Sequence, residues 1–100
     1  MGIFDWLFGG SKNKPVGNLK DGKREGLWKT YYENGQLESE GNYKDGRREG
    51  LWKYYHENGK LKQLSVYKKG VRAGIWKKYN EDGELVEKTD YQLDKDQESD

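Results

Sequence analysis

The residues that could perform chemistry in this chain are few and scattered. His56 is the single histidine, cysteine is absent, and no group of carboxylates is spaced to complete a metal site. The acidic turns at 45–46 and 82–84 lack the spacing of a calcium loop, and no serine lies in a G-x-S-x-G context. The sequence therefore predicts a protein that is not an enzyme and that uses no cofactor, metal or small-molecule substrate.

The dominant pattern is a repeat of 24 residues, which Trp28, Trp52 and Trp76 mark most clearly. Other residue types recur at the same interval: Gly26/Gly50/Gly74, Leu27/Leu51/Ile75, Lys29/Lys53/Lys77, Tyr31/Tyr55/Tyr79, Gly35/Gly59/Gly83, Leu37/Leu61/Leu85 and Tyr43/Tyr67/Tyr91. A period of this length indicates structural units that stack side by side and share one core. The surfaces of such arrays usually bind partners.

Composition limits how thick the core can be. Of 100 residues, 37% are charged and only 31% are hydrophobic, which is too little for a large two-layer core. No apolar stretch approaches the ~20 residues of a membrane span, and the N-terminus lacks the basic region of a signal peptide. We therefore expect a thin fold and a location in the cytoplasm, with the membrane periphery as the alternative.

Turn signals alternate along the chain. Asn34-Gly35, Asn58-Gly59 and Asp82-Gly83 lie within the units, and Asp21-Gly22, Asp45-Gly46 and Lys69-Gly70 lie between them. Such dipeptides are typical of two-residue hairpin loops with positive φ at both positions. The sequence thus predicts an all-β fold, a single-layer twisted antiparallel meander. Its strands are expected at about 16–20, 26–33, 36–43, 50–57, 60–67, 74–80 and 85–91.

Two-residue loops throughout would place Trp28 opposite Gly41 and Tyr32 opposite Leu37. One face of the sheet, here called the tryptophan face, would then carry Trp28/Trp52/Trp76, Leu37/Leu61/Leu85, Tyr43/Tyr67/Tyr91 and the glycines Gly26, Gly41, Gly50 and Gly74. Large rings can lie flat on residues that have no Cβ. The opposite face, here called the lysine face, would carry Leu27/Leu51/Ile75, Lys29/Lys53/Lys77 and Tyr31/Tyr55/Tyr79. On that face we expect Lys29 opposite Glu40 and Leu51 opposite Val66.

Three segments are expected along the chain: an apolar segment and linker at 1–15, the repeats at 16–91, and a disordered acidic tail at 92–100. In the first of these, Phe4, Trp6, Leu7 and Phe8 suit a short amphipathic helix. That helix would either pack on the tryptophan face or enter a membrane interface, with Lys12 and Lys14 near anionic lipid.

The repeated unit G-[LI]-W-K-x-Y-x-x-[ND]-G-x-L-x-x-x-x-x-Y-x-x-G resembles the bacterial variant of the MORN repeat over residues 16 to 91. The resemblance implies a twisted sheet of hairpins and no catalytic residues. Proteins of this class include membrane-associated scaffolds, binding modules, and small bacterial antitoxins or immunity proteins that neutralise a toxin. This chain looks most like the last group.

The functional hypothesis is therefore a non-catalytic protein-binding module, with a toxin as the partner. A peripheral membrane scaffold that contacts lipid through Phe4, Trp6, Leu7 and Phe8 is the alternative. Nucleic acid is not expected as a partner, because acidic turns and an acidic end would repel phosphates. The residues expected to contact the protein partner are the exposed aromatic and basic side chains Tyr32, Tyr54, His56, Arg47, Arg48, Lys69 and Arg72.

Overall fold

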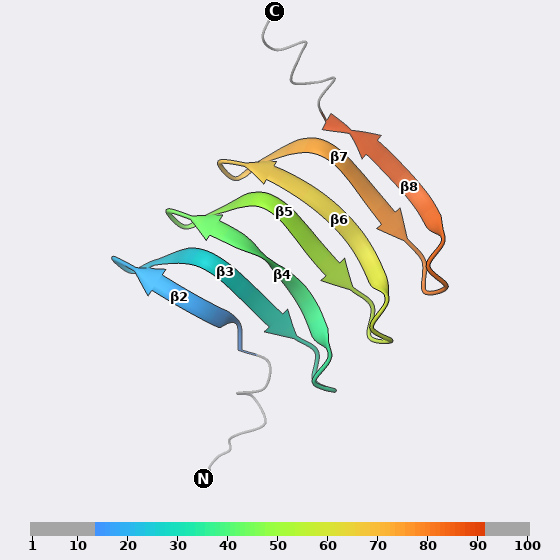
Figure 1. The fold of residues 1–100 in the computed structure, drawn as a ribbon, viewed down its shortest axis with the longest axis horizontal. Helices are drawn as coiled ribbons and strands as arrows, with labels where there is room; N and C mark the ends of the chain where they lie inside the picture. Colours follow the sequence, from blue (N-terminus) through green and yellow to red (C-terminus); the bar gives the residue numbers. More distant parts are fainter. Residues whose placement is uncertain (1–13, 92–100) are drawn as a thin grey trace, which may run out of the picture.

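The computed structural model describes residues 14–91, which form a single antiparallel sheet of seven strands (Figure 1). Each strand pairs with its neighbours in the chain, so the sheet is an open meander. The strands are β2 (Val16–Lys20), β3 (Lys23–Tyr31), β4 (Leu37–Lys44), β5 (Arg47–Tyr55), β6 (Leu61–Lys68), β7 (Val71–Tyr79) and β8 (Leu85–Asp90). The predicted fold class is confirmed. The expected N-terminal helix and acidic tail lie outside the described residues.

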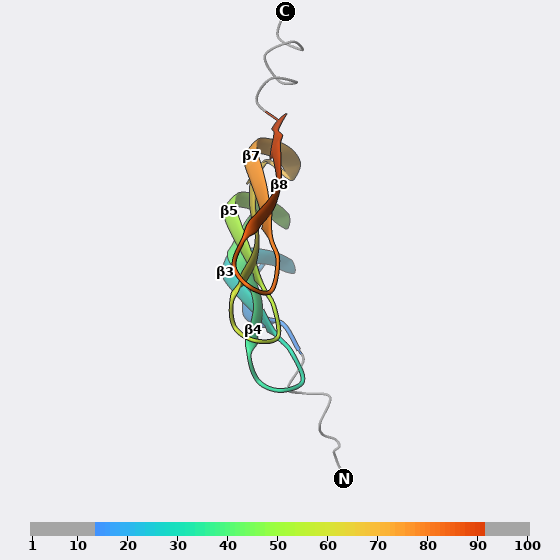
Figure 2. The same cartoon turned by 90° about the vertical axis from the view of Figure 1, so that its right-hand side faces the viewer.

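The sheet has one layer. It measures 58 × 40 × 14 Å, and the edge-on view in Figure 2 shows no second layer over either face of the described chain. Both faces are thus open to solvent except where side chains cover the backbone of their own sheet. Stability has to come from contacts within each face, since no opposing layer supplies them.

The turns between units are tight and have two residues, as predicted. Asp45 has a φ of 54° and Gly46 a φ of 81°. In the other two turns of this family both residues also have a positive φ. Positive φ at both central residues defines a type I′ turn, whose twist matches that of the flanking strands. Pairing resumes at once after each turn, so β3, β5 and β7 begin three residues earlier than predicted.

The turns within units differ from the prediction. Of Asn34 and Gly35, only Gly35 has a positive φ, at 90°. The Tyr32 amide donates to the Gln36 carbonyl (2.8 Å), and the Gly35 amide donates back to the Tyr32 carbonyl (2.9 Å). This is a three-residue loop whose glycine forms a bulge, and the same bonds recur at the other two loops.

The three-residue loop changes one part of the predicted register, and a register shift between Thr30 and Tyr31, with Glu38 as the extra residue, restores the rest. Trp28 lies opposite Gly41 as expected, but Leu37 lies opposite Tyr31 and not opposite Tyr32. The predicted pairs Lys29 with Glu40 and Leu51 with Val66 are confirmed. Because directly opposed residues share a face, the leucine row lies with the tyrosines on the lysine face, and its assignment to the tryptophan face was wrong. The leucines concerned are Leu37, Leu61 and Leu85.

A further bulge explains the glycine that precedes the Leu-Trp or Ile-Trp pair in β3, β5 and β7. Gly50 has a φ of 78°, and around it the register passes from Gly41 opposite Trp52 to Asn42 opposite Glu49. No atom lies within 4 Å of a Cβ built on Gly50. Its backbone conformation, and not contact with an aromatic ring, therefore requires glycine there.

Candidate functional site

The tryptophan face carries a ladder of rings that runs across the strands. Tyr43 lies with its ring edge-on between Trp28 and Trp52, at centroid distances of 6.1 and 5.1 Å. Trp76 lies between Tyr67 and Tyr91 in the same way, at 5.2 and 5.3 Å. Edge-to-face pairs of this kind add to the stabilisation from burial. The ladder is the core of this one-layer fold.

Trp28 and Trp52 also lie flat on the strands that precede theirs, β2 and β4. A Cβ built on Gly41 would be 2.1 Å from Trp52 Cδ2, and one built on Gly17 would be 2.3 Å from Trp28 Cδ2. The indole of Trp52 donates to the Asn42 carbonyl at 3.0 Å. Trp52 is consequently only 4% exposed. The predicted packing of rings on residues without a Cβ is confirmed at Gly41.

Three arginines extend the ladder, and sequence reasoning missed the first of them. The guanidinium carbon of Arg24 is 4.5 Å from the Trp28 ring centroid, and that of Arg48 is 5.2 Å from the Trp52 centroid. Arg72 lies on Trp76 in the same way and donates to the Tyr91 hydroxyl at 3.2 Å. The signal was available, since these arginines are themselves 24 residues apart. Arg48 and Arg72, predicted to contact a partner, thus belong to the ladder.

The predicted aromatic contacts are half-buried and engaged in contacts within the sheet. Tyr54 lies tilted against Trp52, with centroids 6.3 Å apart. Burial raises the pKa of Tyr54 to about 12, against the opposing effect of the Arg48 guanidinium. The Tyr32 hydroxyl donates to the Tyr55 carbonyl at 2.5 Å, which links one unit to the next.

His56 occupies the position of Tyr32 in the following unit and makes the same kind of bond. Its Nε2 lies 2.9 Å from the Tyr79 carbonyl. Since a carbonyl only accepts, Nε2 must carry the proton. The histidine therefore links the second unit to the third.

The remaining predicted residues, Arg47 and Lys69, lie at the edge formed by the type I′ turns. Together with neighbouring turn residues they line a groove of about 330 Å³. The structure thus divides the predicted basic set between this edge and the ladder. The groove is lined by Lys44, Asp45, Arg47, Glu49, Lys68 and Lys69.

The lysine face is the more open of the two. Leu27, Leu51 and Ile75 are 51%, 50% and 38% exposed, whereas every residue buried in the described chain lies on the tryptophan face. The buried residues are Trp28, Ser39, Gly41, Trp52 and Ser65. Each of these three residues is followed two positions later by a lysine on the same face. The lysine face therefore presents apolar and cationic side chains side by side, once per unit.

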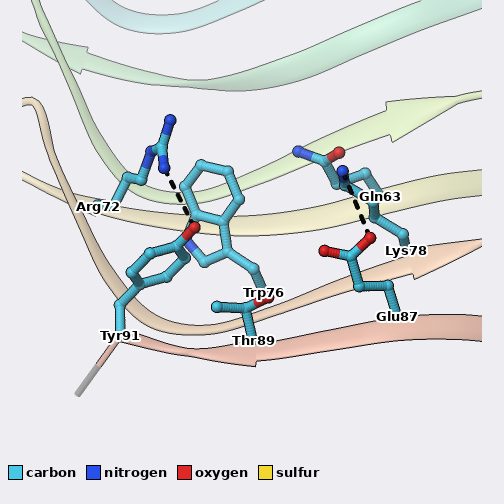
Figure 3. A pocket seen from close by; sticks show the side chains of 7 residues that line it. All are labelled: Gln63, Arg72, Trp76, Lys78, Glu87, Thr89 and Tyr91. Atoms are coloured by element: carbon cyan, nitrogen blue, oxygen red, sulfur yellow. Dashed lines mark hydrogen bonds and ion pairs between the residues drawn. The ribbon is translucent and has the colours of Figure 1, made fainter. Parts of the chain in front are cut away.

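A hollow interrupts the tryptophan face beside Trp76 (Figure 3). Its volume is about 140 Å³. In the preceding unit Tyr54 lies beside the corresponding tryptophan, but here the corresponding residue is Lys78, which pairs with Glu87 at 3.7 Å. The hollow is lined by Gln63, Arg72, Trp76, Lys78, Glu87, Thr89 and Tyr91.

The described residues contain no group of three or more side chains that could hold a metal ion. They also contain no helix long and apolar enough to cross a membrane. The described surfaces offer three kinds of contact to a partner: stacking on aromatic rings, burial of apolar side chains and ion pairing with lysines.

Comparison with protein families identifies the unit. The model of the MORN repeat variant matches residues 24–45, 48–69 and 72–93. The chain belongs to this family. Each matched MORN unit begins at a stacked arginine and includes the tryptophan that this arginine covers. MORN repeats are a non-enzymatic module that generally mediates protein or membrane-lipid interactions. No curated protein and no solved structure matches the chain.

Proposed function

We propose that this MORN sheet is a protein-binding module that docks its lysine face onto a partner. The observation that carries the proposal is the row of Leu27, Leu51 and Ile75, which are between 38% and 51% exposed. Their counterparts on the other face, the tryptophans, are covered by arginines and tyrosines of the same sheet. An apolar row that the described chain leaves open marks an interaction surface.

The spacing of the row suits a helix. Equivalent residues of successive units are two strands apart, or about 9.6 Å. Residues seven apart on an α-helix rise by about 10.5 Å and lie on nearly the same side. An amphipathic helix with apolar residues at this interval would contact all three units. Lys29, Lys53 and Lys77 beside the row favour acidic residues along the flanks of that helix.

The finer proposal is that the partner is a toxin, neutralised by steric occlusion. The resemblance of the repeats to those of small immunity proteins supports it. Occlusion fits a surface without catalytic groups, because binding alone would block the part of the toxin that the sheet covers.

Affinity capture from the native cell tests the docking face. We expect the chain to capture a protein partner and Leu51→Glu to lose it, because a carboxylate would be buried in the apolar row. Leu19→Glu is the matched control, since Leu19 is 63% exposed and lies opposite Arg24 on the tryptophan face. Recovery of no partner, or equal loss with both variants, would contradict the proposal. Toxicity of the captured protein, relieved by the chain, tests the finer proposal.

An anionic membrane surface is the second candidate, because exposed leucines beside lysines also suit lipid headgroups and acyl chains. Phe4, Trp6, Leu7 and Phe8, the predicted lipid contacts, lie outside the described residues. Liposome flotation of the full chain and of a chain that starts at Lys14 separates binding through the N-terminal residues from binding through the lysine face. Binding by neither chain removes the membrane candidate, and equal binding by both assigns it to the sheet.

A further inference from the structure

The groove at the edge of the sheet, here called the edge groove, lies beside two of the three type I′ turns. These turns follow one another along the same edge of the sheet in Figure 1. The edge groove has a volume of about 330 Å³ and is lined by residues of the second and third turns and of the adjoining strands. Four of its lining residues are cations and two are acids, so its formal charge is +2. The cations are Lys44, Arg47, Lys68 and Lys69.

The third turn departs from the repeat in its charge. The first two turns have the sequences KDGKRE at 20–25 and KDGRRE at 44–49, whereas the third reads KKGVRA at 68–73. Lys69 and Ala73 thus replace an aspartate and a glutamate. The formal charge is +1 in each of the first two turns and +3 in the third. The positive charge of the edge groove is therefore a property of this turn and not of the repeat as a whole.

Lys69 occupies its position at a conformational cost. Its φ is 53°, and the residues at the same place in the other two turns, Asp21 and Asp45, both have a φ of 54°. Aspartate adopts this left-handed conformation more readily than lysine, because its short polar side chain bonds to the nearby backbone. Strained residues cluster at functional sites in folded proteins. The exchange of aspartate for lysine therefore indicates a role for the positive charge at this place.

Two contacts bring the cations of the edge groove together. The stem of Arg47 lies on the third turn, where a Cβ built on Gly70 would be 3.4 Å from Arg47 Cβ and 3.5 Å from Arg47 Cδ. The Lys69 amide donates to Glu49 Oε1 at 2.8 Å, which fixes the third turn to β5. Within residues 14–91, none of the four cations of the edge groove forms an ion pair. Their charges are thus available to a ligand.

The two acids of the edge groove limit what can bind. The Glu49 carboxylate is engaged by the Lys69 amide, and Asp45 lies beside the cations. A planar anionic surface would bring its charges close to Asp45 as well as to the cations. An extended segment can instead place separate carboxylates at the cations and a neutral residue at Asp45. The lining therefore favours an acidic segment of a protein.

We propose that the edge groove binds a carboxylate-rich, extended segment of the protein partner. This rests on the proposed function, since it describes a second contact of the same protein-binding module. Arg47 offers planar donors that suit one carboxylate of the segment, and Lys68 and Lys69 pair with others. The lysines of the lysine face favour an acidic partner as well, so both contacts select for the same charge.

A designed peptide tests the proposal directly. The probe is a peptide of alternating glutamate and serine, and its control has glutamine in place of each glutamate. Binding to the full chain is measured by calorimetry at low and at high salt, with the amide resonances of Lys69 and Gly70 followed by NMR. We expect the glutamate peptide to bind at least about tenfold more tightly than the glutamine peptide at low salt and to shift these resonances. High salt should reduce the difference.

The variant Lys69→Asp restores the residue of the other two turns and should weaken binding of the glutamate peptide at least about tenfold. Its fold should persist, because Asp45 adopts nearly the same φ one unit earlier. Lys62→Asp is the matched control, since it makes the same change of charge at an exposed lysine. Lys62 lies near the other end of β6, about 20 Å from Lys68, which is about twice the Debye length in 0.1 M salt. This control should change binding less than about twofold.

Arg47→Ala should weaken binding at least about threefold and serves if Lys69→Asp does not fold. Equal binding of the two peptides, or equal effects of Lys69→Asp and Lys62→Asp, would overturn the proposal. Binding that appears only after Asp94 and Asp96 are replaced by asparagine would assign the edge groove to the chain's own acidic residues and also overturn it. So would binding of the chain to anionic vesicles that Lys69→Asp abolishes while the peptide fails to bind.

The proposed function is tested separately by Leu51→Glu on the lysine face. Loss of cellular capture by that variant with no peptide binding would reject the edge groove and retain the module. Peptide binding that Lys69→Asp abolishes, together with capture that Leu51→Glu leaves unchanged, would support the edge groove and reject the docking face.

Discussion

Gly41 lies directly beneath the indole of Trp52, so close that a Cβ on Gly41 would be 2.1 Å from Cδ2 of the ring. One repeat later, at the position of Gly41, the chain has Ser65, which is fully buried and lies next to Trp76. Trp76 is less deeply buried than Trp52, and its indole nitrogen divides its bond between the carbonyls of Val66 and Ala73. Trp52 and Trp76 thus differ in the residue at this position of the preceding strand, in burial and in the hydrogen bonding of the indole.

Gly41→Ala should lower the free energy of unfolding by about 2 kcal/mol or more, because the methyl group and the indole cannot occupy the same space. Ser65→Ala is the control, since that position already has a Cβ and loses only the bond from Gln63 (2.7 Å). Its cost should stay near 1 kcal/mol. Urea unfolding followed by tryptophan fluorescence measures both, and equal costs would show that the ring relocates freely.

Arg48→Ala should destabilise the sheet by about 1 to 2 kcal/mol, because the guanidinium covers the Trp52 ring at 5.2 Å and the Tyr67 ring at 5.4 Å. Arg48→Lys should recover only part of this, since an ammonium group does not stack as a planar guanidinium does. Arg47→Ala, one residue earlier at the turn, is the control and should change stability by less than about 0.5 kcal/mol. Thermal unfolding of the three variants measures these differences in stability.

Much of this fold was predictable because the same turn dipeptides and strand residues recur in three units. Trp28 opposite Gly41 and Leu51 opposite Val66 follow from counting along strands of period two, and both are confirmed. The type I′ turns followed from two Asp-Gly dipeptides and from Lys69-Gly70 at the same place in the repeat. The Asn-Gly dipeptides also predicted two-residue turns, but the structure has three-residue loops there. Asn34 keeps a negative φ because its side-chain oxygen accepts a hydrogen bond from the Gln36 amide at 2.9 Å.

The candidate site was harder to predict, because burial depends on neighbouring units. Tyr32 and His56 look exposed in the sequence, but each reaches a backbone carbonyl in the next unit. Contacts between turns show the same dependence. Glu49 accepts the Lys69 amide at 2.8 Å, and Ala73 replaces this glutamate in the third unit, which no further turn follows within the described chain. Such contacts join residues about 20 positions apart, beyond what a single strand pattern reveals.

Lys69→Asn should stabilise the protein by about 0.5 to 1 kcal/mol. Lys69 has a φ of 53°, a left-handed conformation that costs a lysine more than an asparagine. Lys68→Asn is the matched control, because it removes the same charge from a residue in β6 that has no positive φ. That variant should not stabilise. Chemical denaturation at two salt concentrations separates the conformational effect from a change in charge repulsion.

Stability should fall as the pH rises from about 10 to 12. The unfolded chain ionises its tyrosines near pH 10, whereas burial raises the pKa of Tyr54 in the folded state to about 12. The folded state therefore holds its proton where the unfolded state has lost it, so the stabilisation is complete below pH 10 and is lost above it. Tyr54→Phe should flatten this part of the profile. An unchanged profile in that variant would mean that another tyrosine dominates.

His56→Ala should weaken the link between the second and third units and lower the free energy of unfolding by about 1 kcal/mol, because the bond to the Tyr79 carbonyl is lost. His56→Tyr should restore the link, since Tyr32 makes the corresponding bond to Tyr55 one unit earlier. Hydrogen exchange locates the effect: protection in β7 and β8 should fall in the alanine variant and return in the tyrosine variant, with β3 unchanged in both. A uniform fall across all strands would instead indicate that the three units unfold as one cooperative body, because neighbouring interfaces in an array of this kind set how far local unfolding spreads.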